Sequence, residues 1–238
     1  MTIEAGSTTY WQAKRGIVQD GLVLNLDAGV DASYGGSGTT WTDLKGGNNG
    51  TLTNMDGANF SSDNGGSLSF DGGDEYIVFN RPSQIVDGGS VSLVLWAKWT
   101  TTGTTQSTIQ SLVDNFHGAV GRITVQDRPD LSKKLTFFIG RDSNGIQSSG
   151  QVGDGTWKHI SCTNDGSTSR IYINGELDNS LAGETGIRNV YDYMNIGRWG
   201  SNSRYLNGQV SGLLIYDRAL TSAEVSRNFN ATRHRFGV

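Results

Sequence analysis

Residues 90–99 read SVSLVLWAKW, and this run decides the fold class. Every second residue from Val91 to Trp99 is apolar, and these side chains would share one face of a β-strand because successive side chains point to opposite faces. The other face also carries apolar residues, Val94 and Trp96. The run therefore predicts a central strand of a sandwich, with one face in the core and the other on a partly covered outer surface.

Short β-like runs bounded by Gly, Asn and Asp continue on both sides of this strand. Their fairly even spacing favours a sandwich or barrel over alternating strands and helices. The nine runs cover residues 21–29, 67–79, 90–99, 122–127, 133–140, 157–165, 169–178, 192–199 and 206–217.

Two local motifs give sharper predictions. Asn174-Gly175 is a pair that accepts positive φ at both central positions of a tight turn, so residues 169–178 are predicted to form a β-hairpin. Thr221 and Glu224 have the spacing of a capping box, in which each side chain satisfies the other's backbone N–H. A short helix is predicted from there to about Asn228.

Composition supports one turn-rich domain. The chain has 238 residues, with 34 Gly and 2 Pro, which is typical of short strands joined by tight turns. A core of this size needs no disulfides, so the single Cys162 is assigned to the core. The composition is uniform from residue 21 to 238, so no linker between domains is predicted there. Residues 1–20 are predicted to form an arm, whose adjacent Tyr10 and Trp11 are candidates for docking onto a neighbouring subunit.

Charge and hydropathy exclude several partners. The net charge is -4, with 19 basic against 23 acidic residues, and this lacks the basic field that a nucleic-acid partner requires. No run of about 18 apolar residues suggests a membrane span, and the first twenty residues lack the apolar stretch of a secretory signal.

Six segments in order carry a resemblance to a known family. These are GLVLNLDAG (21–29), TTWTDLKGGNNGTLTN (39–54), SLSFDGGDEYIVF (67–79), SVSLVLWAKW (90–99), GTWKHISCTNDGSTSRIYINGEL (155–177) and the closing stretch 206–238. They resemble the laminin-G-like jelly-roll family of the concanavalin A-like lectin and glucanase superfamily. The resemblance implies an all-β, two-sheet antiparallel jelly-roll sandwich with a short C-terminal helix. It also implies a choice among glycan binding, surface adhesion, enzyme accessory modules and virion proteins, which fold alone does not make.

The closing FNATRHRFGV (229–238) resembles the ends of such domains in structural proteins of tailed phages. A virion protein is made in the host cytoplasm and released by lysis, which fits a nearly cysteine-free chain without an export signal. The preferred hypothesis is a non-enzymatic protein on a phage virion surface, in contact with other virion proteins or glycans, with a homo-oligomer left open. The alternatives are a glycan-binding module of a bacterial extracellular surface, a purely structural cementing protein and a glycoside hydrolase.

Catalysis has little support in the sequence. A retaining glycosidase needs two carboxylates about 5 to 5.5 Å apart, and glucanases of the superfamily place them in an E-x-D-x-x-E pattern. Glu176 and Asp178 begin such a pattern, but Leu181 stands where the second Glu is needed. We therefore predict that the protein is not an enzyme.

Calcium is the cofactor that the resemblance implies, since relatives often bind it through Asp and Asn oxygens. The candidate ligands are Asp71, Asp74, Asp142 and Asn144. Asp-Gly and Asn-Gly pairs are also ordinary turn formers whose side chains bond their own backbone, and this alternative applies to all four residues.

Glycan recognition predicts aromatic side chains in turn-rich segments, with polar partners for sugar hydroxyls. The best such segment surrounds Trp199. The predicted binding rim consists of Tyr191, Tyr193, Trp199, Asn202, Arg204 and Tyr205. The alternative is that Tyr193 and Tyr205 flank strands and pack their rings at the edge of the core.

Overall fold

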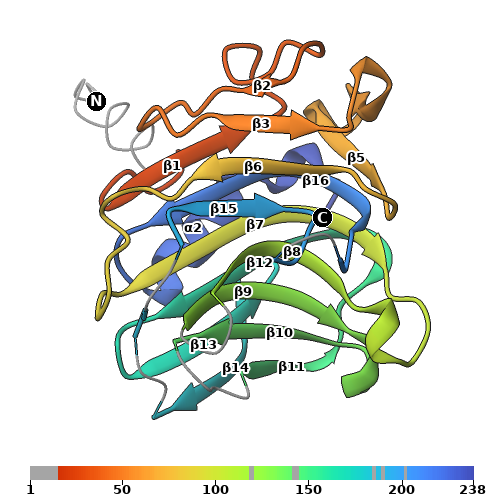
Figure 1. Ribbon diagram of the computed structural model, residues 1–238. Helices are drawn as coiled ribbons and strands as arrows, with labels where there is room; N and C mark the ends of the chain where they lie inside the picture. The colour runs from red at the N-terminus through yellow and green to blue at the C-terminus, as the bar shows by residue number, and fades with distance from the viewer. Residues whose placement is uncertain (1–15, 118–120, 141–144, 184–185, 189–190, 201–202) are drawn as a thin grey trace, which may run out of the picture.

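The computed structural model describes residues 16–117, 121–140, 145–183, 186–188, 191–200 and 203–238. Within these residues the chain forms two eight-stranded antiparallel sheets that face each other as the layers of a sandwich (Figure 1). The predicted all-β jelly-roll sandwich is confirmed. None of the described helices is long and apolar enough to cross a membrane.

One layer, the helix-side sheet, has the order β14-β13-β12-β7-β16-β5-β4, and β1 also pairs with β16. Its strands are β1 (Leu22–Asp27), β4 (Phe60–Ser61), β5 (Ser67–Asp71), β7 (Val91–Thr100), β12 (Asp154–Asn164), β13 (Thr168–Ile173), β14 (Glu176–Ala182) and β16 (Asn207–Tyr216).

The other layer, the opposite sheet, has the order β11-β10-β9-β8-β15-β6-β3-β2. Its strands are β2 (Thr40–Trp41), β3 (Gly50–Thr53), β6 (Tyr76–Asn80), β8 (Gln110–His117), β9 (Gly121–Arg128), β10 (Lys134–Ile139), β11 (Ile146–Gln151) and β15 (Tyr193–Ile196). Short 3₁₀ helices lie in the connections at Gly57–Asn59, Asp63–Gly65, Gln106–Thr108 and Pro129–Leu131, and another, Arg233–Arg235, follows the C-terminal helix.

Strand β7 lies inside the helix-side sheet between β12 and β16. Leu93, Leu95 and Trp99 face the core between the sheets. Val94 and Trp96 face outward, where they are buried under the C-terminal part of the chain. The two-sided apolar pattern of this strand is thus explained by a core on one face and a cover on the other, as predicted.

The predicted hairpin is present. Strands β13 and β14 pair through Ile173 and Glu176, and the turn between them has φ of 51° at Asn174 and 84° at Gly175. Positive φ at both central positions follows the right-handed twist of the strands. A Cβ at Gly175 would lie 2.9 Å from Cδ1 of Phe229, so this glycine also lets the helix pack closely on the turn.

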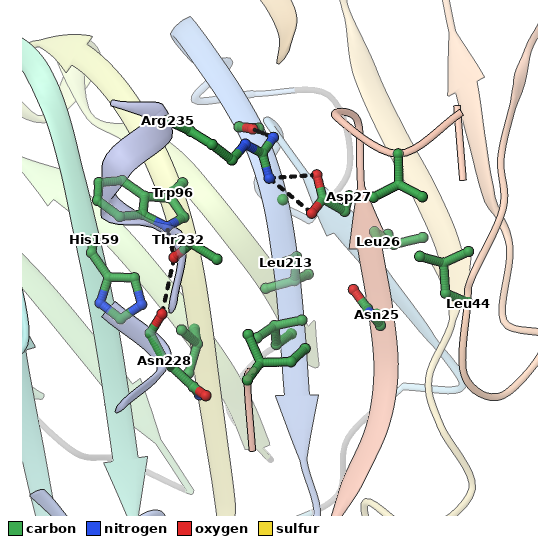
Figure 2. A pocket seen from close by; sticks show the side chains of 16 residues that line it. Asn25, Leu26, Asp27, Leu44, Trp96, His159, Leu213, Asn228, Thr232 and Arg235 are labelled. Carbon is green, nitrogen blue, oxygen red and sulfur yellow. Dashed lines mark hydrogen bonds and ion pairs between the residues drawn. The ribbon is translucent and has the colours of Figure 1, made fainter. Parts of the chain in front are cut away.

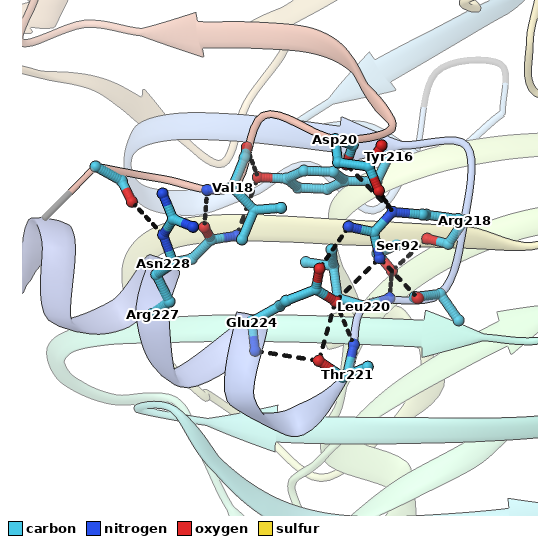
Figure 3. A network of polar contacts seen from close by, with 12 residues as sticks. Val18, Asp20, Ser92, Tyr216, Arg218, Leu220, Thr221, Glu224, Arg227 and Asn228 are labelled. Carbon is cyan, nitrogen blue, oxygen red and sulfur yellow. Dashed lines mark hydrogen bonds and ion pairs between the residues drawn. The ribbon is translucent and has the colours of Figure 1, made fainter. Parts of the chain in front are cut away.

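Helix α2 (Ser222–Thr232) begins with the predicted capping box. The Thr221 hydroxyl accepts from the Glu224 N–H at 3.3 Å, and the Glu224 carboxylate accepts from the Thr221 N–H at 2.9 Å (Figure 3). Arg218 clamps the same carboxylate with two hydrogen bonds of 2.9 and 2.6 Å. These bonds hold the pKa of Glu224 at about 2, so the cap stays charged. The helix ends at Thr232, one turn beyond the predicted Asn228.

A buried polar network fixes α2 to the start of the described chain (Figure 3). The Asn228 side chain accepts from the Val18 N–H at 2.8 Å and donates to the Tyr216 hydroxyl at 3.0 Å. That hydroxyl in turn donates to the Val18 carbonyl at 3.0 Å, and burial raises the pKa of Tyr216 to about 12. The network thus links three parts of the chain: the segment around Val18, strand β16 and helix α2. Tyr10 and Trp11 lie outside the described residues.

We expect Asn228→Ala to lower the free energy of unfolding by about 1 to 3 kcal/mol, because it leaves a buried N–H and a buried hydroxyl without their partner. Urea denaturation measures the change. Asn230→Ala is the matched control, since Asn230 lies on the same helix and is exposed. Equal stability of the two variants would contradict the role given to the network.

A carboxyl group is buried at the inner face of β9. Asp127 is fully buried, and its Oδ1 accepts a hydrogen bond of 2.8 Å from the Thr101 hydroxyl. Burial, opposed by that hydrogen bond, raises the pKa of Asp127 to about 6. The folded state therefore keeps this proton to a higher pH than the unfolded chain, whose Asp titrates near 3.8.

This shift predicts that the wild type loses stability as the pH rises from about 4 to about 6. The unfolded chain ionises first over this range, which lowers stability by at most about 3 kcal/mol. Asp127→Asn keeps an acceptor for Thr101 and removes the titration. We expect its melting temperature to exceed that of the wild type at pH 7 but not at pH 4. The exposed Asp87→Asn is the control, and a parallel pH profile in wild type and Asp127→Asn would contradict the assignment.

Candidate ligand-binding site

Beyond β15, Trp199 and Ser203 pair in an isolated antiparallel bridge. The Trp199 N–H donates to the Ser203 carbonyl at 3.0 Å, and the Gly200 N–H donates to Asp114 Oδ2 at 2.9 Å. Arg204 then places its guanidinium carbon 4.2 Å from the centroid of the Trp199 ring. Both side chains are half-buried, so an aromatic face and a cation form one unit at the surface.

Backbone hydrogen bonds fix this unit to the opposite sheet. The Ser111 N–H donates to the Arg204 carbonyl at 2.9 Å, and the Gly197 N–H donates to the Leu112 carbonyl at 3.1 Å. Arg204 has φ of 55°, in the left-handed region that residues other than glycine rarely adopt. These hydrogen bonds hold the backbone in place, and Arg204 is therefore well positioned.

A cleft of about 290 Å³ lies next to Arg204. Its walls come from the end of β5, the connection from β7 to β8 and the start of β16. The polar and aromatic side chains that line it include Asp71, Thr102, Gln110, Arg204, Tyr205 and Asn207. Three of the sequence-predicted residues, Asp71, Arg204 and Tyr205, thus meet in one cleft although the first is far from the others in the chain.

Gln110 is a residue of this cleft that the sequence did not reveal. It is nearly fully buried, its Oε1 accepts from the Asn207 N–H at 2.8 Å, and its Nε2 donates to the Thr100 carbonyl at 3.1 Å. Gln110 therefore links the start of β16 to the end of β7 at the cleft. Asn207 is exposed and was missed as well; a polar residue at the start of a strand gives no signal of its own.

The polar groups around Arg204 are buried or partly buried. Asp114 is fully buried and accepts from the Thr124 hydroxyl at 2.7 Å. Arg128 and Asp130 form a two-pronged ion pair at 2.9 and 2.8 Å, which holds the pKa of Asp130 below its usual value. Burial lowers the pKa of Arg204, although the two carboxylates partly oppose this effect.

Two members of the predicted rim lie elsewhere. Tyr191 and Tyr193 stack on each other with centroids 5.1 Å apart and rings 12° from parallel. They precede the body of β15, whereas Trp199 follows it. Because a strand rises about 3.3 Å per residue, the ends of this strand are about 10 Å apart. Tyr193 is exposed and does not join the Trp199 unit. Asn202 lies outside the described residues.

Two of the four predicted calcium ligands, Asp71 and Asp74, form local hydrogen bonds. Asp71 Oδ1 accepts from the Gly73 N–H at 2.6 Å, the turn-forming alternative. Asp74 Oδ2 accepts from Asn54 Nδ2 at 3.0 Å. Among described residues no group of three or more His, Cys, Asp or Glu is placed to hold a metal ion. Asp142 and Asn144 lie outside the described residues, and calcium binding stays a prediction.

A separate cavity of about 90 Å³ lies between the helix-side sheet and α2 (Figure 2). Trp96 Nε1 donates to the Thr232 hydroxyl at 2.8 Å, and Arg235 pairs with both oxygens of Asp27 at 3.0 and 2.9 Å. His159 lies beneath Trp96, and burial lowers its pKa to about 3, so it is neutral at pH 7. These contacts hold the C-terminal segment on the sheet, and we interpret the cavity as a packing feature.

Two facing antiparallel sheets with a terminal helix on one outer face define the class of this protein as a jelly-roll sandwich. The family model described as the concanavalin A-like lectin/glucanases superfamily matches residues 71–226. The chain belongs to this family. A comparison with curated proteins gives no match.

Solved structures share this fold at low sequence identity. A sialidase of Trypanosoma rangeli in complex with the inhibitor DANA has a TM-score of 0.65 and 16% identity, over 90% of this chain and 33% of that one. The chain thus spans about a third of that sialidase. Domain 4 of AbnA, an extracellular arabinanase from Geobacillus stearothermophilus in complex with arabinotriose, has a TM-score of 0.63 and 17% identity, over 88% of this chain and 98% of that one.

The binding domain of Paraclostridial Mosquitocidal Protein 1 is also similar, with a TM-score of 0.65 and 17% identity. The match covers 89% of this chain and 52% of that one. At these identities the likenesses establish the shared fold.

Proposed function

We propose that this protein is a non-enzymatic glycan-binding module that contacts its ligand through the Trp199–Arg204 unit and the adjoining cleft. The observation that carries the proposal is the half-buried indole of Trp199 with the Arg204 guanidinium 4.2 Å from its centroid, beside a polar cleft. Sugar rings offer CH faces to aromatic rings and hydroxyls to polar side chains, and this pair presents both kinds of partner within one contact.

Arg204 has donors to spare for a ligand. A guanidinium carries five N–H donors, and the hydrogen bond that engages this one among the described residues is a long contact of 3.4 Å to Gln126 Oε1. The indole fixes the group without using its donors. Half-burial of Arg204 also makes a hydrogen bond to a sugar hydroxyl stronger than it would be in bulk water.

The structural relatives support this proposal at the level of the fold. The AbnA domain was solved with arabinotriose, and the toxin fragment is described as a binding domain. The match covers 98% of the AbnA domain, which is therefore a single unit of this architecture, and 52% of the toxin's binding domain. A comparable role for this chain agrees with its family.

We expect Trp199→Ala and Arg204→Ala each to weaken binding to any glycan that the wild type selects on an array by at least about tenfold, or about 1.4 kcal/mol. Tyr193→Ala is the matched control, because it removes an exposed aromatic ring at the other end of β15 and should change affinity less than about twofold. Melting temperatures check that each variant is folded. Unchanged binding by both site variants, or no glycan bound by the wild type, would overturn the proposal.

The absence of catalysis is part of the same proposal. Asp178 is engaged, since its carboxylate accepts from the Ser149 N–H at 2.7 Å and from the Ser149 hydroxyl at 2.6 Å. Glu176 is exposed on the same edge strand, and Leu181, 40% exposed, stands where a second glutamate is needed. These residues offer no enclosed acid and base pair for glycoside hydrolysis.

A screen of polysaccharides and chromogenic glycosides, including sialosides, should therefore give turnover no higher than the buffer blank. A matched preparation of Glu176→Gln controls for contaminating hydrolases. Activity that persists in purified wild type and disappears in this variant would refute the non-enzymatic assignment.

Display on a phage virion remains the proposed setting, with a bacterial extracellular surface and a structural cementing role as alternatives. The supporting feature is the sequence of residues 229–238. Within this fold the same residues also have a packing role, since Phe236 stacks on Trp96 with centroids 4.0 Å apart. Capsid or tail genes beside the coding sequence would favour the virion, and a role in assembly would add contacts with other virion proteins or further copies of the chain.

A further inference from the structure

A second groove, of about 450 Å³, lies beside the cleft on the outer face of the helix-side sheet. Its polar lining includes Ser69, Lys98, Thr100, Thr102, Asn207 and Gln209. Thr102 and Asn207 line the cleft as well. The two hollows therefore meet at these residues and form one continuous surface, which we call the trough.

Strand register explains the floor of the groove. Gln209 of β16 lies opposite Ser69 of β5 and Lys98 of β7, so the three side chains form a row across three strands. Gln209 Nε2 donates to the Ser69 hydroxyl at 3.2 Å. Trp96, the preceding outward residue of β7, is covered by Phe236. The C-terminal segment thus covers the sheet as far as Trp96, and the groove begins at Lys98.

Lys98 is a half-buried cation without a protein counter-charge in the described part of the chain. Its register neighbours are Gln209 and, on β12, Trp157, and neither carries a charge. An ammonium group that no carboxylate neutralises attracts an anionic group of a ligand. The carboxylate that lines the trough is that of Asp71, at the cleft end. Lys98 therefore places a cation in the groove and Arg204 places one in the cleft, on either side of the point where the two hollows meet.

The junction at Asn207 is open. Asn207 is exposed, its N–H donates to Gln110 as described above, and it lines both hollows. Gly72 stands against it with φ of 82°, and a Cβ there would come within 3.1 Å of Asn207 Cβ. A side chain at position 72 would crowd the passage, whereas glycine leaves room for a ligand.

We propose that the trough binds an acidic oligosaccharide of several units, with one sugar at the Trp199–Arg204 unit and an anionic sugar, bearing a carboxylate or a sulfate, at Lys98. This inference rests on the proposed glycan-binding function and specifies its ligand class. The two hollows flank a shared residue, so one sugar does not fill both. Affinity therefore increases with chain length, and the charged unit contributes through a point contact that salt screens.

The test uses one to six-unit series of neutral cello-oligosaccharides, oligogalacturonides and sulfated heparin fragments on an array and in calorimetry. We expect wild-type affinity for one acidic series to increase at least about tenfold from one to four units and to exceed that for neutral chains. Lys98→Met keeps the aliphatic stem and removes the charge. It should abolish the acidic preference and leave single-sugar binding within about twofold. Lys134→Met, on β10 of the opposite sheet, is the matched control.

The outcomes separate this inference from the function on which it rests. If Trp199→Ala abolishes binding but Lys98→Met behaves as wild type, the proposal of an acidic ligand in the trough is wrong, whereas the proposed glycan-binding site is supported. Equal affinity for neutral and acidic chains has the same consequence. If the wild type binds no member of the array, both proposals fail. If Lys98→Met abolishes the preference for acidic chains, the inference is supported. The wild type's preference for carboxylated or for sulfated chains then identifies the anion bound at Lys98.

Discussion

Strand β7 has to bury apolar side chains on both of its faces, and much of the architecture follows from this. Leu93, Leu95 and Trp99 require a second sheet, which closes the sandwich over them. Val94 and Trp96 require a cover on the outside, which α2 and the residues after it supply. The stacking of Phe236 on Trp96 and the ion pair between Arg235 and Asp27 hold this cover down. Apolar area on both faces of one strand thus accounts for the three layers.

The cover does not extend over the whole strand, and the candidate ligand surface begins where it ends. After Trp96 the outward residues of β7 turn polar, starting with Lys98, and the neighbouring strands offer Ser69 and Gln209 at the same level. The loops at this end of the sandwich then add the cleft and the Trp199–Arg204 unit. A rigid sandwich with polar loops at one end is a common way to build a binding site, because the strands fix the positions from which the loops project.

Buried polar side chains hold the loops in place at the end of the sandwich that carries the cleft. Gln110 joins the start of β16 to the end of β7, and Asp114 accepts from the Gly200 N–H next to Trp199. Their hydrogen bonds are shielded from water and directional, so the loops they hold have few alternative arrangements. This accounts for a half-buried arginine held in a left-handed backbone conformation next to an aromatic ring. The groups to which the proposed function assigns ligand contact are thereby held in place in advance, which would reduce the ordering cost of binding.

The sequence by itself determined the sandwich, the Asn174-Gly175 hairpin and the capping box at Thr221, because each depends on residues near one another in the chain. It missed β8, since Gln110, Asp114 and Asn115 are polar yet buried and break the alternation that reveals a strand. It also grouped Tyr191 and Tyr193 with Trp199, although β15 separates them. The cleft and the trough unite residues around positions 70, 100, 110 and 205, and only the register of the paired strands decides that these meet. Local patterns fix elements, whereas long-range hydrogen bonds and burial fix which elements become neighbours.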